Sequence, residues 1–312
     1  MGVLLKTKNM FKYIASDRKK FLSSLLENFG GWVPDKYYLK MMFRLRMGKK
    51  LDLVNPITFN EKLQWLKLYN RKSDLPLLVD KYAVKDSVAK TIGSDYVIPT
   101  LGVWNDVESI DFSSLPNQFV LKTTHGGGGE DVVICRDKSV FDVEKAKAKL
   151  KISMGRSLYK RFREWPYKSV PRKIIAERYL EDDDGGLTDY KFFCFDQYVD
   201  CVMVCLDRYS GETKFYFFDE QWNLKRLNIR GKNAPADFTL KKPDCLKEMF
   251  EIAKKLSKGH PFVRVDLYNC KKKVFFGEMT FYPDAGFDSN LLAETDLYFG
   301  DKIHLPNEKR KG

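Results

Sequence analysis

Four consecutive glycines, Gly126 to Gly129, most constrain what this chain can fold into, because they stand between two apolar stretches at 119–123 and 131–135. Glycines without side chains let backbone N–H groups approach phosphate oxygens closely, and Lys122 adds a cation beside them. Neither a helix nor a Lys-Ser/Thr pair follows the glycines, which excludes a dinucleotide loop and a Walker loop. The pattern predicts a phosphate-cradling β-hairpin, with a flexible hairpin and an ordinary strand lysine as the alternative.

The rest of the sequence indicates a mixed α/β (α+β) protein with a helical N-terminal third. Apolar runs predict strands at 119–123, 131–135, 173–180, 190–195, 198–205, 213–218, 262–268 and 273–280. Helical spacing and capping residues predict helices at 36–48, from Thr58 onward, at 80–90, at 142–152 and at 243–257. A chain of 312 residues suits one large or two intimate domains. We expect a helical region at 1–75, a central region at 76–172 and a C-terminal region at 173–312.

The six cysteines are scattered without a CxxC pair, which favours buried free thiols and a reducing compartment. The first thirty residues lack the apolar core of a secretion signal, and no later segment has the roughly 18 uninterrupted apolar residues of a membrane span. We therefore expect a cytoplasmic protein.

The formal net charge of +13 favours a polyanionic partner. Basic residues are spread along the chain and no nucleic-acid-binding motif is present, so nucleic acid is not the expected partner. Residues 6–26 form a basic amphipathic pattern, with apolar residues at helical spacing. Such a helix packs on the protein body with a solvated basic face, or lies on an anionic membrane surface.

An acidic run follows the apolar stretch 174–180, which contains Glu177. A strand that runs into carboxylates can present backbone groups to an adenine edge and acids to a ribose. Asp182 and Asp184 also fit the DxD pattern with which many nucleotide-sugar glycosyltransferases hold a divalent metal. A charged surface turn is the third interpretation.

The most informative pattern is a predicted hairpin that carries Arg264, Asp266, Glu278 and Thr280. Residues two apart on a strand project to the same side, so these four can share one face. Buried carboxylates are costly unless they are paired or bound to metal. Their oxygens suit Mg²⁺, whereas a structural ion pair with Arg264 is the alternative. Upstream, Lys191 on another predicted strand can point into the same cleft.

In this order, the four segments resemble the ATP-grasp superfamily, and more closely its TupA-like branch, over residues 35 to 306. The resemblance implies an ATP-grasp fold, with two α+β subdomains that clasp the nucleotide and a helical N-terminal extension. It implies ATP and Mg²⁺ as cofactors. Expected nucleotide-binding residues are Lys122, His125, Gly126, Gly127, Gly128, Gly129, Glu177, Arg178, Leu180, Asp184 and Lys191. Expected catalytic residues are Lys122, Lys191 and Arg264, and expected metal ligands are Asp266, Glu278 and Thr280. Thr280 departs from the family, which usually has Asn there.

The resemblance further implies a ligase that activates a carboxylate as an acyl phosphate and joins it to an amine. The expected carboxylate is a uronic acid of a surface polysaccharide or its precursor, and the expected amine is an amino acid or amino alcohol. A metal-dependent glycosyltransferase, resting on the DxD pattern at 182–184, is the main alternative. A polyanion-binding protein without activity and a kinase for hydroxyl groups also stay open.

Overall fold

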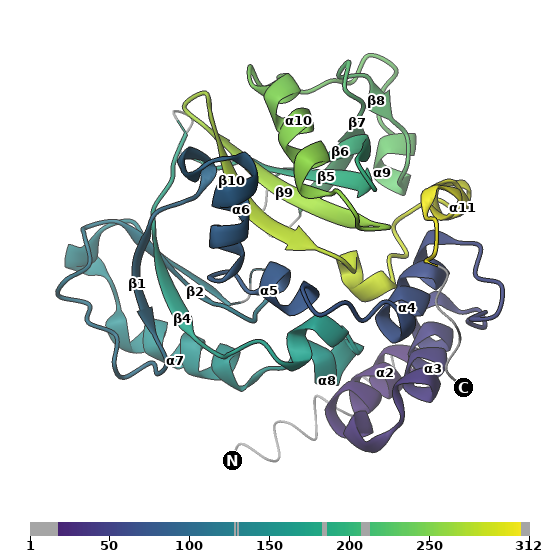
Figure 1. Cartoon of the computed structure of the whole chain (residues 1–312), viewed down its shortest axis with the longest axis horizontal. Helices are drawn as coiled ribbons and strands as arrows, with labels where there is room; N and C mark the ends of the chain where they lie inside the picture. The colour runs from purple at the N-terminus through teal and green to yellow at the C-terminus, as the bar shows by residue number, and fades with distance from the viewer. Residues whose placement is uncertain (1–17, 128, 130, 183–185, 207–212, 307–312) are drawn as a thin grey trace.

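The computed structural model describes residues 18–127, 129, 131–182, 186–206 and 213–306. Two antiparallel sheets make up the body, and helices cover them (Figure 1). Helices α2 to α4 lie together at the lower right of Figure 1, away from the four-stranded sheet. No described helix has the length and apolar character needed to cross a membrane.

The four-stranded sheet has the strand order β1-β4-β2-β3 and carries the glycine-rich segment between its last two strands. Its strands are β1 (Thr100–Trp104), β4 (Ile174–Arg178), β2 (Phe119–Thr123) and β3 (Val132–Cys135). Helix α7 (Val143–Gly155) packs against β2 and β3. Asp142 caps this helix by accepting a hydrogen bond from the Lys145 N–H at 2.9 Å.

The six-stranded sheet has the order β10-β9-β5-β6-β7-β8 and contains the C-terminal candidate residues. Its strands are β5 (Asp189–Phe195), β6 (Tyr198–Leu206), β7 (Lys214–Phe218), β8 (Leu224–Lys225), β9 (Val263–Cys270) and β10 (Lys273–Thr280). Strands β9 and β10 form a hairpin whose turn residues, Lys271 and Lys272, both have positive φ. That combination is typical of a two-residue type I′ turn.

The helices cover both faces of the second sheet and extend beyond it. They are α2 (Arg18–Phe29), α3 (Asp35–Met47), α4 (Phe59–Tyr69), α5 (Leu75–Val79), α6 (Val84–Ile92), α8 (Leu158–Phe162), α9 (Ile229–Lys232), α10 (Leu246–Leu256) and α11 (Ala293–Lys302). Short 3-10 turns include η1 (Gly30–Trp32), η4 (Trp165–Lys168) and η5 (Pro283–Gly286). Helix α4 begins with a capping box, in which Thr58 and Glu61 satisfy each other's backbone N–H groups.

The main core lies between the six-stranded sheet and helices α4 and α11. The Phe59 ring lies 4.8 Å from that of Phe262 and 5.5 Å from that of Phe299, centroid to centroid. Phe193 of β5 stacks on Phe299 at 5.3 Å. Helix α10 packs on β5, β6 and β9. The N-terminal helices are therefore joined to the second sheet through α4.

All eight predicted strands are present, and the mixed α+β class is confirmed. The helix predicted at 80–90 begins later, at Val84, because Asp80 accepts hydrogen bonds from the N–H groups of Tyr82 and Ala83 and holds a turn there. Strand β4 pairs with β1 and β2, so sheet membership changes after β4. The division of the chain at 75 and 172 stays a prediction. Residues 6–17 of the predicted N-terminal helix lie outside the described residues.

Candidate active site

Glu177 of β4 forms ion pairs with two lysines, one on the neighbouring strand β2 and one on α6. Its carboxylate lies 2.7 Å from the Lys122 ammonium of β2 and 2.6 Å from the Lys85 ammonium of α6. Burial works to raise the pKa of Glu177, but the two lysines overcome this effect and leave that pKa below its ordinary value. Burial also works to lower the pKa of Lys122, and Glu177 raises it above its ordinary value. The three groups are charged and hold one another in place.

The glycine-rich segment is folded against Asp131. A Cβ on Gly126 would lie 2.1 Å from Asp131 Oδ2, so only glycine fits at this position. Asp131 Oδ2 also accepts a hydrogen bond from the Thr123 hydroxyl at 3.2 Å. The Lys81 ammonium donates to the Gly126 carbonyl oxygen, and the Lys81 N–H donates to the Thr124 carbonyl at 3.0 Å. The start of the loop is therefore anchored, as a phosphate-binding segment requires.

In the second sheet, Asp266 of β9 lies between two cations. Arg264 donates to both oxygens of this carboxylate, each at 2.7 Å, and the Lys191 ammonium of β5 lies 2.6 Å from Oδ2. Asp189 lies 2.5 Å from the same ammonium. Burial works to lower the pKa of Lys191, whereas Asp189 and Asp266 raise it above its ordinary value. The ion pair between Arg264 and Asp266, which the sequence left open as the alternative to a metal site, is present.

A β-bulge at Gly277 brings Glu278 and Thr280 to the face of Asp266. In the outer part of the hairpin Phe276 pairs with Leu267, and continuing that register would set Glu278 opposite Val265. The register shifts by one residue at the bulge, so Glu278 pairs with Asp266 instead. Glu278 Oε1 then accepts from Thr280 Oγ1 at 3.2 Å and lies 3.4 Å from Arg264 Nη2. The predicted grouping of these four residues is confirmed.

Lys81 joins the two halves of the site. Its ammonium lies 3.8 Å from Asp131 Oδ2 beside the first sheet and 3.8 Å from Glu278 Oε2 on the second. Burial works to raise the pKa of Glu278, but Lys81, Arg264 and the other nearby cations lower it to about 2. The glycine-rich loop and the carboxylate hairpin thus face one another across a single cationic side chain.

The described site balances its charges. Five cations and five carboxylates contribute to it: Lys81, Lys85, Lys122, Lys191 and Arg264, and Asp131, Glu177, Asp189, Asp266 and Glu278. An anionic ligand that enters this cluster would add uncompensated negative charge. It would be accommodated best together with its own cations.

Only some of the carboxylate oxygens on the β9–β10 hairpin are available to bind the predicted magnesium ion. The Glu278 side chain is a third exposed, and its Oε2 lies 3.8 Å from the Lys81 ammonium, so this oxygen suits a hard cation that completes its shell with water and phosphate. Both oxygens of Asp266 already accept from Arg264 and Lys191, so Asp266 can bind a metal only if one of these cations moves away. Among the described residues, no group of three or more Asp, Glu, His or Cys side chains converges as a metal cage.

Other predicted nucleotide-binding residues lie around the first sheet. His125 is buried under the loop, and neither of its ring nitrogens has a hydrogen-bond partner among the described residues. Burial, helped by Arg172 and Lys81, lowers the pKa of His125, which favours the neutral ring. The Arg178 N–H donates to the Pro99 carbonyl at 3.1 Å, and the Arg178 side chain is exposed.

Leu180 packs in a small cluster with Ile98, Cys270 and Phe275. Asp182 accepts a hydrogen bond from the Lys271 N–H at 3.0 Å, which joins the acidic run to the β9–β10 turn. Gly128 and Asp184 lie outside the described residues, so the structure does not describe the full DxD pattern. The roles expected for these residues stay predictions.

Four further residues contact the predicted site and were not among the expected site residues: Lys81, Lys85, Asp131 and Asp189. Two lysines four residues apart at the start of a predicted helix were an available signal, because that spacing puts both on one side. Asp131 and Asp189 each stand at the beginning of an apolar strand run, where a charged residue is conspicuous.

A buried acid also lies close to this cluster. Burial raises the pKa of Glu164 to about 7, with Lys67 opposing and Glu278 adding to the shift. The Lys67 ammonium is fully buried and donates to the carbonyl oxygens of Phe162 and Ala285 at 2.9 and 2.6 Å. Burial lowers its pKa to about 7. These two groups border the site beside η5.

The chain matches the TupA-like ATP-grasp family over residues 61–304. Among curated proteins, none matches it in sequence. Among solved structures, D-alanine–D-alanine ligase from Bacillus anthracis shares 13% identity with a TM-score of 0.43, over 73% of this chain and 66% of that one. N5-carboxyaminoimidazole synthetase from Staphylococcus aureus, in complex with ADP, shares 15% identity with a TM-score of 0.43, over 93% and 65%. The chain thus spans slightly less than two thirds of the length of these two proteins.

Proposed function

The chain belongs to the TupA-like ATP-grasp family, and from this premise we propose that it is an ATP-dependent carboxylate–amine ligase. The observation that carries the proposal is the position of Lys81, whose ammonium lies 3.8 Å from Asp131 beside the first sheet and 3.8 Å from Glu278 on the second. It brings a glycine-rich loop and a carboxylate-bearing hairpin to one place. Phosphoryl transfer from ATP needs both, because it depends on positioning and charge neutralisation.

In this proposal the first sheet binds the nucleotide. Lys122 contacts the α- and β-phosphates, and the segment from Gly126 to Gly129 covers them with backbone N–H groups. Glu177 accepts a hydrogen bond from the adenine amino group. Since Glu177 is held by Lys122 and Lys85 in this structure, nucleotide binding would exchange one of these ion pairs for a contact with ATP.

The second sheet would perform the chemistry. A carboxylate is a poor electrophile, so its oxygen attacks the γ-phosphorus, the bond to ADP breaks, and an acyl phosphate forms. An amine then attacks the acyl carbon, loses a proton and displaces phosphate. In this proposal Lys191 stabilises the transferred phosphoryl group, and Arg264 stabilises the tetrahedral oxyanion. Magnesium, held by Glu278, Thr280 and a freed Asp266, would neutralise phosphate charge.

We further propose a uronic acid of a surface polysaccharide or its precursor as the carboxylate, and an amino acid or amino alcohol as the amine. The excess of basic residues, which gives a net charge of +13, supports an acidic substrate. The six cysteines are all free and buried, which agrees with a reaction in the reducing cytoplasm, where ATP is present.

Trapping with hydroxylamine tests the reaction type. Hydroxylamine intercepts an acyl phosphate as a hydroxamate, which a ferric-ion assay detects. We expect hydroxamate from glucuronic or galacturonic acid only when ATP and Mg²⁺ are both present, and none with Arg264→Ala. ADP formation without hydroxamate for any uronic acid, but with phosphate on a sugar hydroxyl, would show that the chain is a kinase.

A further inference from the structure

Helix α2 packs Leu26 against the main core but exposes other apolar side chains. Leu22, Leu25 and Phe29 recur at helical spacing and are 48%, 36% and 72% exposed. The opposite side holds Ser23, which is buried, and Glu27, which pairs with Arg161 at 3.0 Å. A surface helix normally shows the reverse arrangement, with its apolar stripe towards the core. The described basic residues of the predicted helix, Arg18, Lys19 and Lys20, are exposed as expected, and these apolar side chains are exposed as well.

The same exposure continues into the next two elements. Trp32 in η1 is 85% exposed, and Tyr37 and Met41 on α3 are 63% and 49% exposed. Helix α2 packs against η1 and α3, so these side chains belong to one helical unit. We call the six residues from α2, η1 and α3 the N-terminal apolar surface. Exposed large apolar side chains that gather on one helical unit are typical of contact sites for another protein or a membrane.

Unpaired cations accompany the N-terminal apolar surface. Lys36, Lys40 and Arg44 follow one another at four-residue spacing on the exposed side of α3. None of them forms an ion pair with any residue that the structure describes, and the same is true of Lys50. Helices that lie at the boundary between lipid headgroups and acyl chains typically carry Tyr and Trp together with Lys and Arg.

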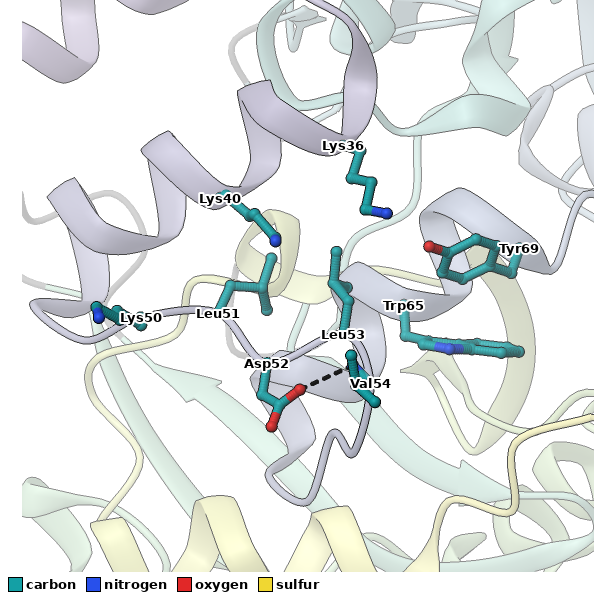
Figure 2. Close-up of a pocket in the computed structure, with 9 residues that line it drawn as sticks. All are labelled: Lys36, Lys40, Lys50, Leu51, Asp52, Leu53, Val54, Trp65 and Tyr69. Carbon is teal, nitrogen blue, oxygen red and sulfur yellow. Dashed lines mark hydrogen bonds between the residues drawn. The ribbon is translucent and has the colours of Figure 1, made fainter. Parts of the chain in front are cut away.

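A pocket of about 380 Å³ opens beside these cations. Figure 2 shows Lys36 and Lys40 reaching from α3 towards the turn at 51–54, with the ring of Trp65 on the other side. Asp52 fixes that turn by accepting a hydrogen bond from the Val54 N–H at 2.7 Å. Three lysines line the pocket and Asp52 is its only acidic lining residue, so it suits an anionic group.

We propose that the N-terminal apolar surface docks the chain on an anionic bilayer, with Lys36, Lys40 and Arg44 at the phosphate headgroups. A second copy of the chain would bring the same unpaired cations against each other, which disfavours a dimer at this surface. A bilayer that carries anionic lipids offers both complements at once, because acyl chains accept the apolar residues and headgroups neutralise the cations. Docking would deliver the site to substrates held at a membrane.

Co-sedimentation of the full chain with vesicles tests the apolar contribution. The vesicles contain phosphatidylcholine alone or phosphatidylcholine mixed with phosphatidylglycerol. We expect binding to the mixed vesicles, weakened about tenfold or more by the pair Phe29→Ser and Trp32→Ser, since each exposed aromatic loses its burial in the bilayer. The matched control is the pair Val140→Ser and Ile152→Ser, whose residues are 81% and 63% exposed elsewhere. The control pair should bind as the unsubstituted chain does.

A second pair tests the charge contribution. Lys36→Gln with Lys40→Gln should weaken binding to the mixed vesicles roughly 25-fold, about fivefold for each lysine, and added salt should reduce the difference. Lys254→Gln with Lys258→Gln, also exposed and four residues apart, makes the same change in net charge and should have little effect. Unchanged thermal unfolding of every variant excludes misfolding as the cause.

Three results would overturn the proposal. The first is no binding of the unsubstituted chain to mixed vesicles, and the second is equal weakening by the test and control pairs. The third is a dimer in light scattering that the Phe29 and Trp32 substitutions dissociate, because it would assign the surface to a second copy of the chain.

Discussion

Substituting Gly277 by alanine tests whether the bulge builds the candidate metal face. A Cβ at this position would lie 2.9 Å from the Asp266 carbonyl oxygen and 3.0 Å from the Tyr268 ring. The carbonyl belongs to the paired strand and cannot rotate away, so the hairpin must shift. Overpacking of this kind costs about 1 to 3 kcal/mol. Because the shift occurs where Glu278 comes opposite Asp266, it should also separate these two carboxylates.

Two assays on Gly277→Ala measure the two consequences. Urea unfolding followed by circular dichroism should show a free energy of unfolding about 1 to 3 kcal/mol lower. Titration calorimetry with ADP and Mg²⁺ should show about tenfold weaker binding, which corresponds to one lost contact of about 1.4 kcal/mol. Gly155→Ala is the control, because a Cβ there meets nothing within 4 Å and the residue lies in a helix. Stability and Mg²⁺-dependent ADP binding of Gly277→Ala equal to those of this control would refute the role of the bulge.

Three further predictions concern charged groups. Lys122→Met should weaken ADP binding at least tenfold. It should also raise the pKa of Glu177, because only Lys85 then opposes the effect of burial on this carboxyl group. Direct calorimetry measures the affinity, and unchanged ADP binding would contradict the role of Lys122 in nucleotide binding. Asp266→Ala leaves two buried cations without their shared carboxylate. Urea unfolding should show a free energy of unfolding about 3 to 5 kcal/mol lower. A change below about 1 kcal/mol would show that this pairing does not stabilise the fold. Burial raises the pKa of Glu164 from 4.5 to about 7, so the folded chain binds more protons than the unfolded chain between these pH values. The free energy of unfolding should therefore fall by up to about 3 kcal/mol as pH rises through this range. Glu164→Gln should remove that fall in a pH series of unfolding curves, and an identical pH dependence in both proteins would exclude Glu164 as its source.

The sequence predicted the parts of the site that depend on local pattern. Period-two alternation located the β9 and β10 residues, and the glycine run located the loop between β2 and β3. What alternation could not predict is the register across the β9–β10 hairpin. With the two-residue turn at Lys271 and Lys272, regular pairing sets Glu278 opposite Val265, and only the bulge at Gly277 corrects this. A glycine within a strand suggests such a bulge but does not say on which side of it the register shifts.

Elements held by distant contacts were harder to predict. Strand β1 is half exposed and contains Gly102, so its sequence lacks a strong strand pattern, and pairing with β4 determines its structure. Helix α11 has a weak apolar stripe, and it is fixed mainly by packing of Phe299 among the rings of the core. The positions of Lys81, in the turn before α6, and of Lys85, on α6, depend on how this segment packs between the two sheets, which is a tertiary property.

The partly exposed apolar side of α2 shows a different limit of sequence reasoning. The apolar spacing of Leu22, Leu25 and Leu26 predicts a helix, but periodicity does not say which of these side chains meet the core. In the structure Glu27 turns inward because it pairs with Arg46 and Arg161. Leu26 packs against the main core, whereas Leu22 and Leu25 stay exposed.

Calorimetric titration with ADP and Mg²⁺, and separately with a UDP-sugar and Mg²⁺, distinguishes an ATP-dependent ligase from a glycosyltransferase. We expect the unsubstituted chain to bind ADP in a Mg²⁺-dependent manner, and Lys122→Ala and Asp266→Ala each to weaken ADP binding at least tenfold. We expect no binding of the UDP-sugar. Binding of the UDP-sugar without binding of ADP would exclude the proposed ligase and favour a metal-dependent glycosyltransferase.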